Sequence, residues 1–395
     1  MATASAAYRP RRPEQGALHQ LVRDHFETFR AQAAGLRGGQ GLPRFVEQEF
    51  RDFLTCGCLA AGFARFRCAS CHLDRLVPFS CKGRGFCPSC GGRRMTDRSA
   101  HLVDHVFPPV PVRQAGVPAA RTLRGGVEWV LSLPPRVRYV LAWDHELCRA
   151  LVAVYVRAVL GWLRRHARGR GAADGRGGAV AIVQRFGAAL NLNVHIHALV
   201  MDGVFVPDSA RGVRFCPVQP MGADDVAALL TTIERRIEKL LARRGVSDGN
   251  EGCDVPDRYA DEAPTLAGLA AASVRGVAAL GARAGVPVRR WGDAIDVPDP
   301  PPLGRWHARQ HGFDLHAGIV VQAGDRDRLE RLCRYALRPP VGQDRLQLTP
   351  DGKAVLELRR RWTDGTTHLV FEPVELLERL AALTECGHAI VGGRN

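Results

Sequence analysis

Two closely spaced cysteine pairs are the first residues in this chain whose type and spacing predict chemistry. Two residues separate Cys68 from Cys71, two separate Cys87 from Cys90, and residues 72–86 lie between the pairs. Such a gap lets both thiolates of a pair bind one zinc ion at about 2.3 Å, and two pairs complete a tetrahedral site. We therefore expect these four cysteines to hold a structural Zn²⁺ ion.

Further cysteines in the same segment leave the ligand set open. Cys56 and Cys81 are possible extra zinc ligands, in a second, partial site with His72 or in place of one of the four. A redox pair or a set of buried cysteines is the alternative to zinc. The segment is also basic and aromatic, and Arg93 and Arg94 follow it directly, which is typical of zinc ribbons that bind phosphates. A ribbon that docks a protein is the other interpretation.

A His-x-His pair is the second candidate site. His195 and His197 lie in segment 191–200, whose apolar residues predict a strand. Residues two apart on a strand point to the same face, so the two imidazoles should lie side by side. Two neutral imidazoles at this spacing form part of a divalent-metal site. Two ordinary exposed or core histidines are the alternative.

The third ligand of such a site is expected to be an oxygen, because Mg²⁺ prefers oxygen donors in octahedral geometry. Gln184 is the first choice, since a turn at 187–190 would bring its strand alongside the histidines. A polar strand-end residue bonded to backbone is its other interpretation. His316, on an expected strand at 313–322, is the alternative ligand and would favour Mn²⁺ or a softer ion.

Tyr335 lies on an expected helix at 325–338, about 100° from the centre of the apolar face. This position suits a phenol at the rim of a site, although an ordinary boundary tyrosine would also occupy it. Arg334 and Arg338 flank the tyrosine and could hold phosphates, or could belong to a solvated helix face. The apolar face consists of Leu329, Leu332, Cys333 and Ala336.

Three motifs in this order are similar to those of a known family: FSCKGRGFCPSCGGRRM, QRFGAALNLNVHIHALVMDGVF and LERLCRYALRPP. Together they resemble the rolling-circle transposases of the insertion-sequence 91 type, which belong to the HUH (His-hydrophobic-His) endonucleases. The resemblance covers roughly 17–240 and 311–380. Arg331 occupies the position where many members carry a second tyrosine, so the resemblance is to the one-tyrosine branch.

The resemblance implies an N-terminal zinc-binding domain and a catalytic domain with a central antiparallel sheet. It also implies a tyrosine nucleophile at Tyr335 and a metal-binding pair at His195 and His197, with Mg²⁺ or Mn²⁺ as the catalytic ion. The implied reaction is single-strand DNA nicking and strand transfer through a 5′-phosphotyrosine, which would mobilise the element that encodes the enzyme. The alternatives are a catalytically inactive DNA-binding zinc protein and a metal phosphoesterase that activates water.

The element pattern predicts an α+β fold in which helices and strands surround these motifs. Strands are expected at 127–133, 179–186 and 193–200, a helix at 224–244, and a hairpin from 353–362 and 366–371. The predicted organisation is a flexible basic arm (1–16), a helical and zinc-binding DNA-binding domain (17–107), a linker (108–126), the first catalytic part (127–244), an insertion or mobile link (245–310), the second catalytic part (311–380) and a possibly truncated tail (381–395).

Charge and composition agree with a nucleic-acid-binding enzyme. The 395 residues carry 55 Lys+Arg against 40 Asp+Glu, a formal net charge of +15, and only three of the basic residues are lysines. Arginine suits phosphates and guanine edges, although a coding bias would give the same richness. Nothing in the sequence is typical of a signal peptide or a membrane span. We expect a cytoplasmic, nucleoid-associated protein that binds single-stranded DNA or hairpin ends, with possible self-association.

Overall fold

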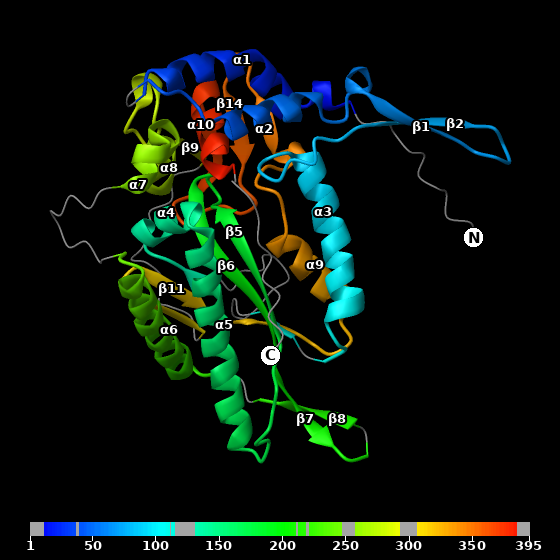
Figure 1. The fold of residues 1–395 in the computed structure, drawn as a ribbon, viewed down its shortest axis with the longest axis vertical. Helices are drawn as coiled ribbons and strands as arrows, with labels where there is room; N and C mark the ends of the chain where they lie inside the picture. The colour runs from blue at the N-terminus through cyan, green and yellow to red at the C-terminus, as the bar shows by residue number, and fades with distance from the viewer. Residues whose placement is uncertain are drawn as a thin grey trace.

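The computed structural model describes residues 12–36, 39–110, 112–114, 131–210, 212–218, 221–246, 257–292 and 306–384. Within them the chain forms two antiparallel sheets with helices packed around both, and two further hairpins (Figure 1). This arrangement confirms the expected α+β class and its central antiparallel sheet. Among the described residues, no helix combines the length and apolarity that a membrane crossing needs.

The N-terminal part is helical and carries one projecting hairpin. A 3₁₀ turn (Pro13–Gln15), α1 (Ala17–Ala34) and α2 (Arg44–Thr55) come first, and the helices pack together through Phe26, Phe29 and Phe50. Strands β1 (Phe63–Arg67) and β2 (Asp74–Pro78) form a hairpin that reaches away from the rest of the chain (Figure 1). Then α3 (Pro88–His101) begins on a proline, which suits a first helical turn, and continues into a π-helical turn (Leu102–Val106).

The central sheet has β6 (Leu192–Met201) in the middle. On one side β6 pairs along its length with β5 (Ala179–Phe186), as the sequence predicts. On the other side it pairs with β4 (Leu131–Ser132) and, further along, with β3 (Val112–Gln114). The sheet extends beyond β4 through β11 (Phe313–His316) and β10 (His307–Gln310), and beyond β3 through β12 (Ile319–Val321).

The two faces of this sheet differ in character. Ile196 and Ala198 belong to a large core with α4 (Pro135–Trp143), α5 (His145–Arg168) and α6 (Ala223–Arg243). His195, His197 and Leu199 alternate with them and therefore point to the opposite face. There Leu199 packs against α9 (Arg326–Ala336) and the π-helical turn after α3. The histidines are thus placed beneath the helix that carries the candidate tyrosine.

The second sheet consists of β13 (Leu346–Leu348), β14 (Ala354–Glu357), β15 (Thr366–Phe371) and β9 (Arg289–Gly292). The expected hairpin is present, because β14 pairs with β15. One core joins this sheet to α1, α2, α8 (Pro264–Arg275) and α10 (Pro373–Leu383). The remaining elements are α7 (Arg258–Glu262), three 3₁₀ turns (Leu59–Ala61, Gly281–Arg283 and Gln343–Arg345), and a hairpin of β7 (Gly203–Asp208) and β8 (Gly212–Pro217).

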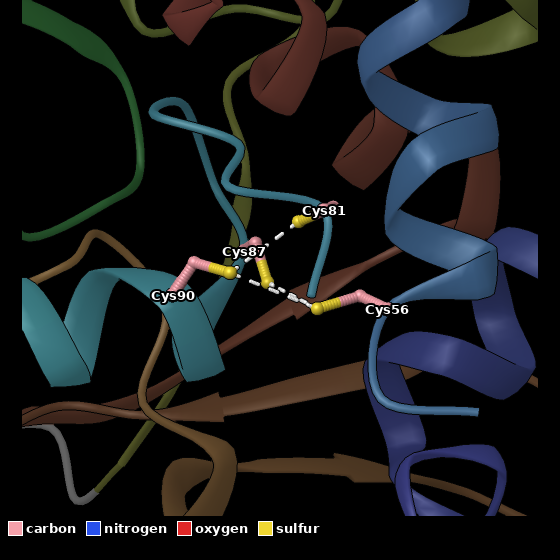
Figure 2. A group of neighbouring side chains, drawn as sticks. All are labelled: Cys56, Cys81, Cys87 and Cys90. Carbon is pink, nitrogen blue, oxygen red and sulfur yellow. Dashed lines mark hydrogen bonds between the residues drawn. The ribbon is translucent and has the colours of Figure 1, made fainter. Parts of the chain in front are cut away.

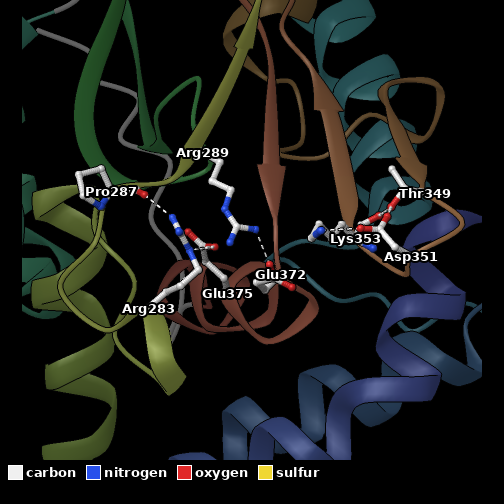
Figure 3. Close-up of polar contacts among 8 residues, drawn as sticks. All are labelled: Arg283, Pro287, Arg289, Thr349, Asp351, Lys353, Glu372 and Glu375. Atoms are coloured by element: carbon white, nitrogen blue, oxygen red, sulfur yellow. Dashed lines mark hydrogen bonds and ion pairs between the residues drawn. The ribbon is translucent and has the colours of Figure 1, made fainter.

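The segment expected as an insertion or mobile link, 245–310, is in part an integral piece of the fold. Its strand β9 pairs with β15, and Arg289 lies 2.5 Å from the Glu372 carboxylate at the start of α10 (Figure 3). Arg283 lies 3.6 Å from buried Glu375 on α10. The described part of this segment is therefore no mobile link, because strand pairing and ion pairs hold it against β15 and α10. That the segment is an insertion stays a prediction.

The structure also differs from the sequence at other expected boundaries. The expected linker 108–126 contains β3, which belongs to the central sheet, and its residues 111 and 115–126 lie outside the described residues. The expected strand 313–322 is two strands, β11 and β12, which join different parts of the sheet. Of the expected strand 127–133, the structure describes 131–133, and β4 occupies the first two of these residues. Most of the expected arm and tail, 1–11 and 385–395, also lies outside the described residues.

Candidate functional site

The histidine pair lies side by side on β6, as its spacing predicts. The two rings are 4.9 Å apart, and both side chains are buried. His195 Nδ1 lies 2.6 Å from the Asn193 carbonyl oxygen, which can only accept a hydrogen bond. The Nδ1 atom of His195 is therefore the donor, and its Nε2 lone pair remains available for a metal ion.

Electrostatics keep both imidazoles neutral. Burial lowers the pKa of His195 to about 4, with a further contribution from the positive charges of Arg338 and Arg138. Burial, His195 and Arg338 lower the pKa of His197 well below its ordinary value. Since metal ligation needs the neutral imidazole, the pair is in the required state at neutral pH.

Gln184 lies next to the pair, as the strand register predicts. It pairs directly with His195 across β5 and β6, so the two side chains share one face. Its Nε2 donates to the Ala336 carbonyl on α9 at 3.1 Å. Its Oε1 is buried and has no hydrogen-bond partner within the part of the chain that the structure describes. A buried amide oxygen without a partner, beside two neutral imidazoles, fits the oxygen ligand that a hard divalent ion requires.

His316, the alternative third ligand, belongs to another cluster. Its Nε2 lies 2.9 Å from Asp314 Oδ1, and its ring stacks on His307. The described residues that surround the His-x-His pair therefore favour Gln184 over His316 as the third ligand.

Tyr335 lies at the edge of the histidine site. Its ring centroid is 6.3 Å from that of His197, and the side chain is half-buried. The Arg338 guanidinium lies 3.9 Å from the Tyr335 ring centroid and 5.4 Å from that of Phe186. Arg338 also donates to the Tyr335 carbonyl at 2.9 Å. His197 and Tyr335 are 138 positions apart along the chain, yet they lie in one site, with the Arg338 guanidinium over the Tyr335 ring.

A cleft opens beside Tyr335 and is lined by arginines. Arg345 lines it and is half-buried, and burial together with Arg359 and Arg338 lowers its pKa. Guanidinium groups that repel one another at the wall of a cleft favour an anionic occupant. The aromatic ring of Trp362 adds an apolar surface there. The basic residues that line this cleft are Arg290, Arg338, Arg345, Arg359, Arg360 and Arg361.

A second basic pocket lies between the N-terminal domain and the edge of the central sheet. It shares Phe186, Arg338 and Pro340 with the tyrosine cleft, so the two hollows meet at Arg338. Burial, together with Arg94 and Arg84, lowers the pKa of Arg98. Its basic residues are Arg84, Arg94, Arg98, Arg149, Arg185 and Arg338.

The four arginines expected at DNA have different surroundings. Arg338 and Arg94 line the basic hollows, and Arg94 also donates to the Gly83 carbonyl at 2.7 Å. Arg93 is exposed on α3, and Arg334 is ion-paired with Glu330. The sequence reasoning missed the arginine run 359–361 and Trp362. Three consecutive arginines before a tryptophan in a hairpin turn are the signal that could have identified them.

Four cysteines meet in the N-terminal domain, but they are not the expected four. Cys56 at the end of α2, Cys81, and Cys87 and Cys90 at the start of α3 point toward one another (Figure 2). The Sγ atoms are 3.7 Å apart for Cys56–Cys90 and Cys56–Cys87, and 3.5 Å for Cys81–Cys90. Ligands at about 2.3 Å in a tetrahedron lie about 3.8 Å apart, so the cluster fits one zinc ion.

Cys68 and Cys71 lie outside this cluster, which corrects the expected pairing of the two Cys-x-x-Cys motifs. They are exposed at the tip of the β1–β2 hairpin, whose strands carry residues 68–73 away from the core. Cys68 Sγ lies 3.1 Å from Ser70 Oγ. The residues that replace them are Cys56 and Cys81, the two expected only as extra ligands. The expected partial site with His72 is not among the metal-binding groups of the described residues.

The cysteine cluster lies next to the tyrosine helix. Gly91 follows Cys90 directly, and a Cβ atom on it would lie 2.6 Å from Pro339 Cβ. Glycine is therefore required for this close approach of α3 to the residues after α9. Pro339 is four residues from Tyr335, so the cluster supports the position of the nucleophile candidate.

Two family models match the chain. The first, described as "Putative transposase", matches residues 178–385, which is more than half of the chain and includes the histidine pair and Tyr335. The second, described as "Transposase zinc-binding domain", matches residues 21–116, which contain the cysteine cluster. The chain belongs to the insertion-sequence 91 family of transposases. The transposase is a DNA-processing, zinc-binding protein. No curated protein and no solved structure matches it.

Proposed function

We propose that this transposase nicks single-stranded DNA at Tyr335 and transfers the strand through a 5′-phosphotyrosine, in a rolling-circle reaction that moves its element. The observation that carries the proposal is the 6.3 Å approach of the Tyr335 ring to His197. This approach supports the proposal because the Tyr335 phenol lies beside two neutral imidazoles and an amide oxygen that has no hydrogen-bond partner among the described residues. A tyrosine that only packs at the boundary of its helix would not need these metal-ligating groups beside it.

His195, His197 and Gln184 would hold a divalent ion, Mg²⁺ or Mn²⁺. Such an ion supplies Lewis-acid polarisation of the scissile phosphate when bound. The hydrogen bond from His195 to Asn193 and that from Gln184 to Ala336 orient two of the three ligands. Preoriented ligands bind a metal more tightly than mobile ones, because less side-chain freedom is lost on binding.

Tyr335 acts as the nucleophile. Its phenolic oxygen bonds to the phosphorus, the bond from phosphorus to the 3′ oxygen breaks, and that oxygen takes up a proton as a free 3′-OH. The phenolic proton leaves to solvent through the open cleft. The Arg338 guanidinium, 3.9 Å from the ring centroid, stabilises negative charge on the phenol. The phosphotyrosine conserves the bond energy for joining to a second 3′-OH.

The arginine-lined hollows provide a path for the DNA backbone on both sides of Tyr335. A single strand would pass from the pocket beside α3, over Arg338, into the cleft beside Trp362. Arginines contact phosphates without regard to sequence, and an aromatic ring stacks on any base. The combination favours a single strand, because unpaired bases are free to stack.

The zinc ligands in this proposal are Cys56, Cys81, Cys87 and Cys90. Four thiolates close the coordination sphere, so the ion is structural. Its role is to hold α2, the loop at Cys81 and α3 together, and through Gly91 to hold α3 against Pro339.

A cleavage assay with a labelled single-stranded oligonucleotide from the element end tests the proposal. We expect Tyr335→Phe to abolish nicking, while Tyr139→Phe, whose hydroxyl bonds to Asp257 at the surface, keeps it. Retention of cleavage in Tyr335→Phe would indicate a phosphoesterase that activates water. Binding without cleavage in the wild-type chain would indicate an inactive DNA-binding protein.

A further inference from the structure

The β1–β2 hairpin carries two cysteines at its tip, apart from the candidate nicking site and the zinc cluster. Residues 69–71 form a turn between the strands, and Cys68 and Cys71 are both exposed. The hairpin reaches away from the rest of the chain (Figure 1). Among the described residues, no group of three or more metal-ligating side chains includes either cysteine. The tip therefore offers one pair of thiol ligands, whereas a zinc ion needs four ligands.

The backbone of the tip holds this pair in a compact loop. The His72 amide donates to the Cys68 carbonyl at 3.0 Å, and the Cys68 amide donates to the Leu73 carbonyl at 3.0 Å. His72 has a left-handed φ of 58°, which reverses the chain directly after Cys71. Hydrogen bonds with the Ser70 hydroxyl, with the Cys71 amide and thiol, and with the Ser70 amide lower the pKa of Cys68 to about 6. The loop thus favours a Cys68 thiolate beside Cys71, and the thiolate is the form that binds zinc.

The face of the hairpin that carries Cys68 is apolar and exposed. Residues two apart on a strand share a face, so Cys68 lies with Phe66, whose cross-strand partner is Arg75. Leu73 and Val77 lie two residues on either side of Arg75. The exposed fractions are 60% for Phe66, 70% for Leu73 and 40% for Val77. The outer edges of both strands pair with no other described strand. Large exposed apolar side chains beside free strand edges indicate a surface that another molecule covers.

We propose that Cys68 and Cys71 bind a zinc ion together with the same two cysteines of a second copy of this chain. Two copies related by a two-fold axis present the same surface to each other. Each copy then supplies one Cys-x-x-Cys pair, and four thiolates complete a tetrahedral site. The apolar side chains beside the thiols pack across the same axis. A second copy is the favoured occupant, because it supplies both missing ligands and a matching apolar surface at once.

The charges near the tip suit such a site. A zinc ion with four thiolates carries a net charge of −2. Arg67 and Arg75 are exposed on the hairpin close to the cysteines, so two copies bring four guanidinium groups near the ion. The acidic residue of these strands, Asp74, is ion-paired with Arg65. The surplus of positive charge stabilises the anionic zinc centre.

The mass in solution and the zinc content together test the site, without reference to nicking. The full-length protein is studied by sedimentation velocity in a phosphine reductant, so that no disulfide links the copies, and zinc is counted by mass spectrometry. We expect a dimer with about 1.5 zinc ions per chain, one in each four-cysteine cluster and one shared between the hairpin tips. Cys68→Ser/Cys71→Ser should give a monomer with about one zinc ion per chain.

Two controls separate the proposed interface from a general effect on folding. Cys58→Ser should stay dimeric, because Cys58 is half-buried in the same segment and belongs to neither cysteine group. Phe66→Ser should raise the dissociation constant of the dimer at least tenfold, whereas Val213→Ser, equally exposed at 60% on the β7–β8 hairpin, should not. Zinc retained in the four-cysteine cluster of each variant shows that its N-terminal domain is still folded.

Three results would overturn the proposal. They are a monomeric wild type, an unchanged dimer in Cys68→Ser/Cys71→Ser, and a monomer with two zinc ions per chain, in which the same chain supplies the missing ligands. Equal dissociation constants for Phe66→Ser and Val213→Ser would place the interface elsewhere. An unchanged mass with weaker DNA binding in Cys68→Ser/Cys71→Ser would assign the hairpin to DNA. None of these results depends on whether Tyr335 nicks DNA.

Discussion

The side-chain amide of Gln184 donates to the backbone carbonyl of Ala336, 3.1 Å away. Ala336 follows Tyr335 directly, and Gln184 pairs with His195. One side chain therefore joins the strand beside the histidine pair to the helix that carries the tyrosine. In the proposed reaction, this contact would couple metal binding to the position of the nucleophile, so a change at Gln184 should affect both.

Gln184→Ala should raise the metal concentration needed for half-maximal nicking by about tenfold or more, because an oxygen ligand is lost. A metal titration of nicking with Mg²⁺ and Mn²⁺ measures this. Gln184→Glu keeps an oxygen at the same place and should restore most of the metal affinity. DNA affinity should stay unchanged in both variants. An unaltered metal requirement in Gln184→Ala would remove Gln184 from the site.

Cys56→Ser or Cys81→Ser should release the zinc ion and unfold the N-terminal domain, since metal binding supplies on the order of 10 kcal/mol of its folding free energy. Cys68→Ser and Cys71→Ser are the matched controls and should keep one zinc per chain, because both residues are exposed on the hairpin. Zinc content by mass spectrometry and thermal melting report the outcome. Zinc loss in Cys68→Ser with zinc retained in Cys56→Ser would reinstate the pairing expected from spacing.

Replacing arginines 359–361 by alanine should weaken the salt dependence of single-strand binding. Each phosphate contact contributes about −0.7 to the slope of log affinity against log salt, so losing three should make the slope shallower by roughly 2. The control replaces Arg23, Arg30 and Arg51, which are ion-paired on α1 and α2, and should leave the slope nearly unchanged. Equal slopes for the two triple variants would place the DNA path elsewhere.

Glu378 should make stability depend on pH. Burial raises the pKa of Glu378 to about 7. Hydrogen bonds from the Ala279 and Leu280 amides to its carboxylate lower the pKa, but their effect is smaller than that of burial. Because the folded pKa lies above the ordinary 4.5, the stability contribution is complete below pH 4.5 and is lost as the pH rises through 7. We expect a loss of at most about 3 kcal/mol between pH 5 and 8, measured by urea unfolding. In Glu378→Gln this fall should disappear, and an identical fall would assign it to another group.

The sequence predicted those parts of the site that depend on local pattern. Alternation along 191–200 placed His195 and His197 on one face, and a short turn brought Gln184 beside them. Helical periodicity placed Tyr335 at the rim of its helix.

Other features depend on packing between distant segments, which spacing does not report. Cys68 and Cys71 have the spacing of a zinc pair, yet the hairpin carries them away, while Cys56 reaches the site from the end of α2. The segment containing Arg289 has a loop-like composition, but it completes the second sheet through pairing with β15. His316 sits near Asp314 and not with the His195 site because β11 is two strands from β6.

The covalent adduct is the most direct measurement of the central claim. Wild-type protein is incubated with Mn²⁺ and a single-stranded oligonucleotide labelled at its 3′ end, and the products are separated on a denaturing gel and mapped by peptide mass spectrometry. The account predicts a labelled protein band whose modified peptide contains Tyr335, and no such band for Tyr335→Phe or for the His195→Ala/His197→Ala variant. Nicked DNA without any protein-linked label, or an adduct that maps to another residue, would contradict it.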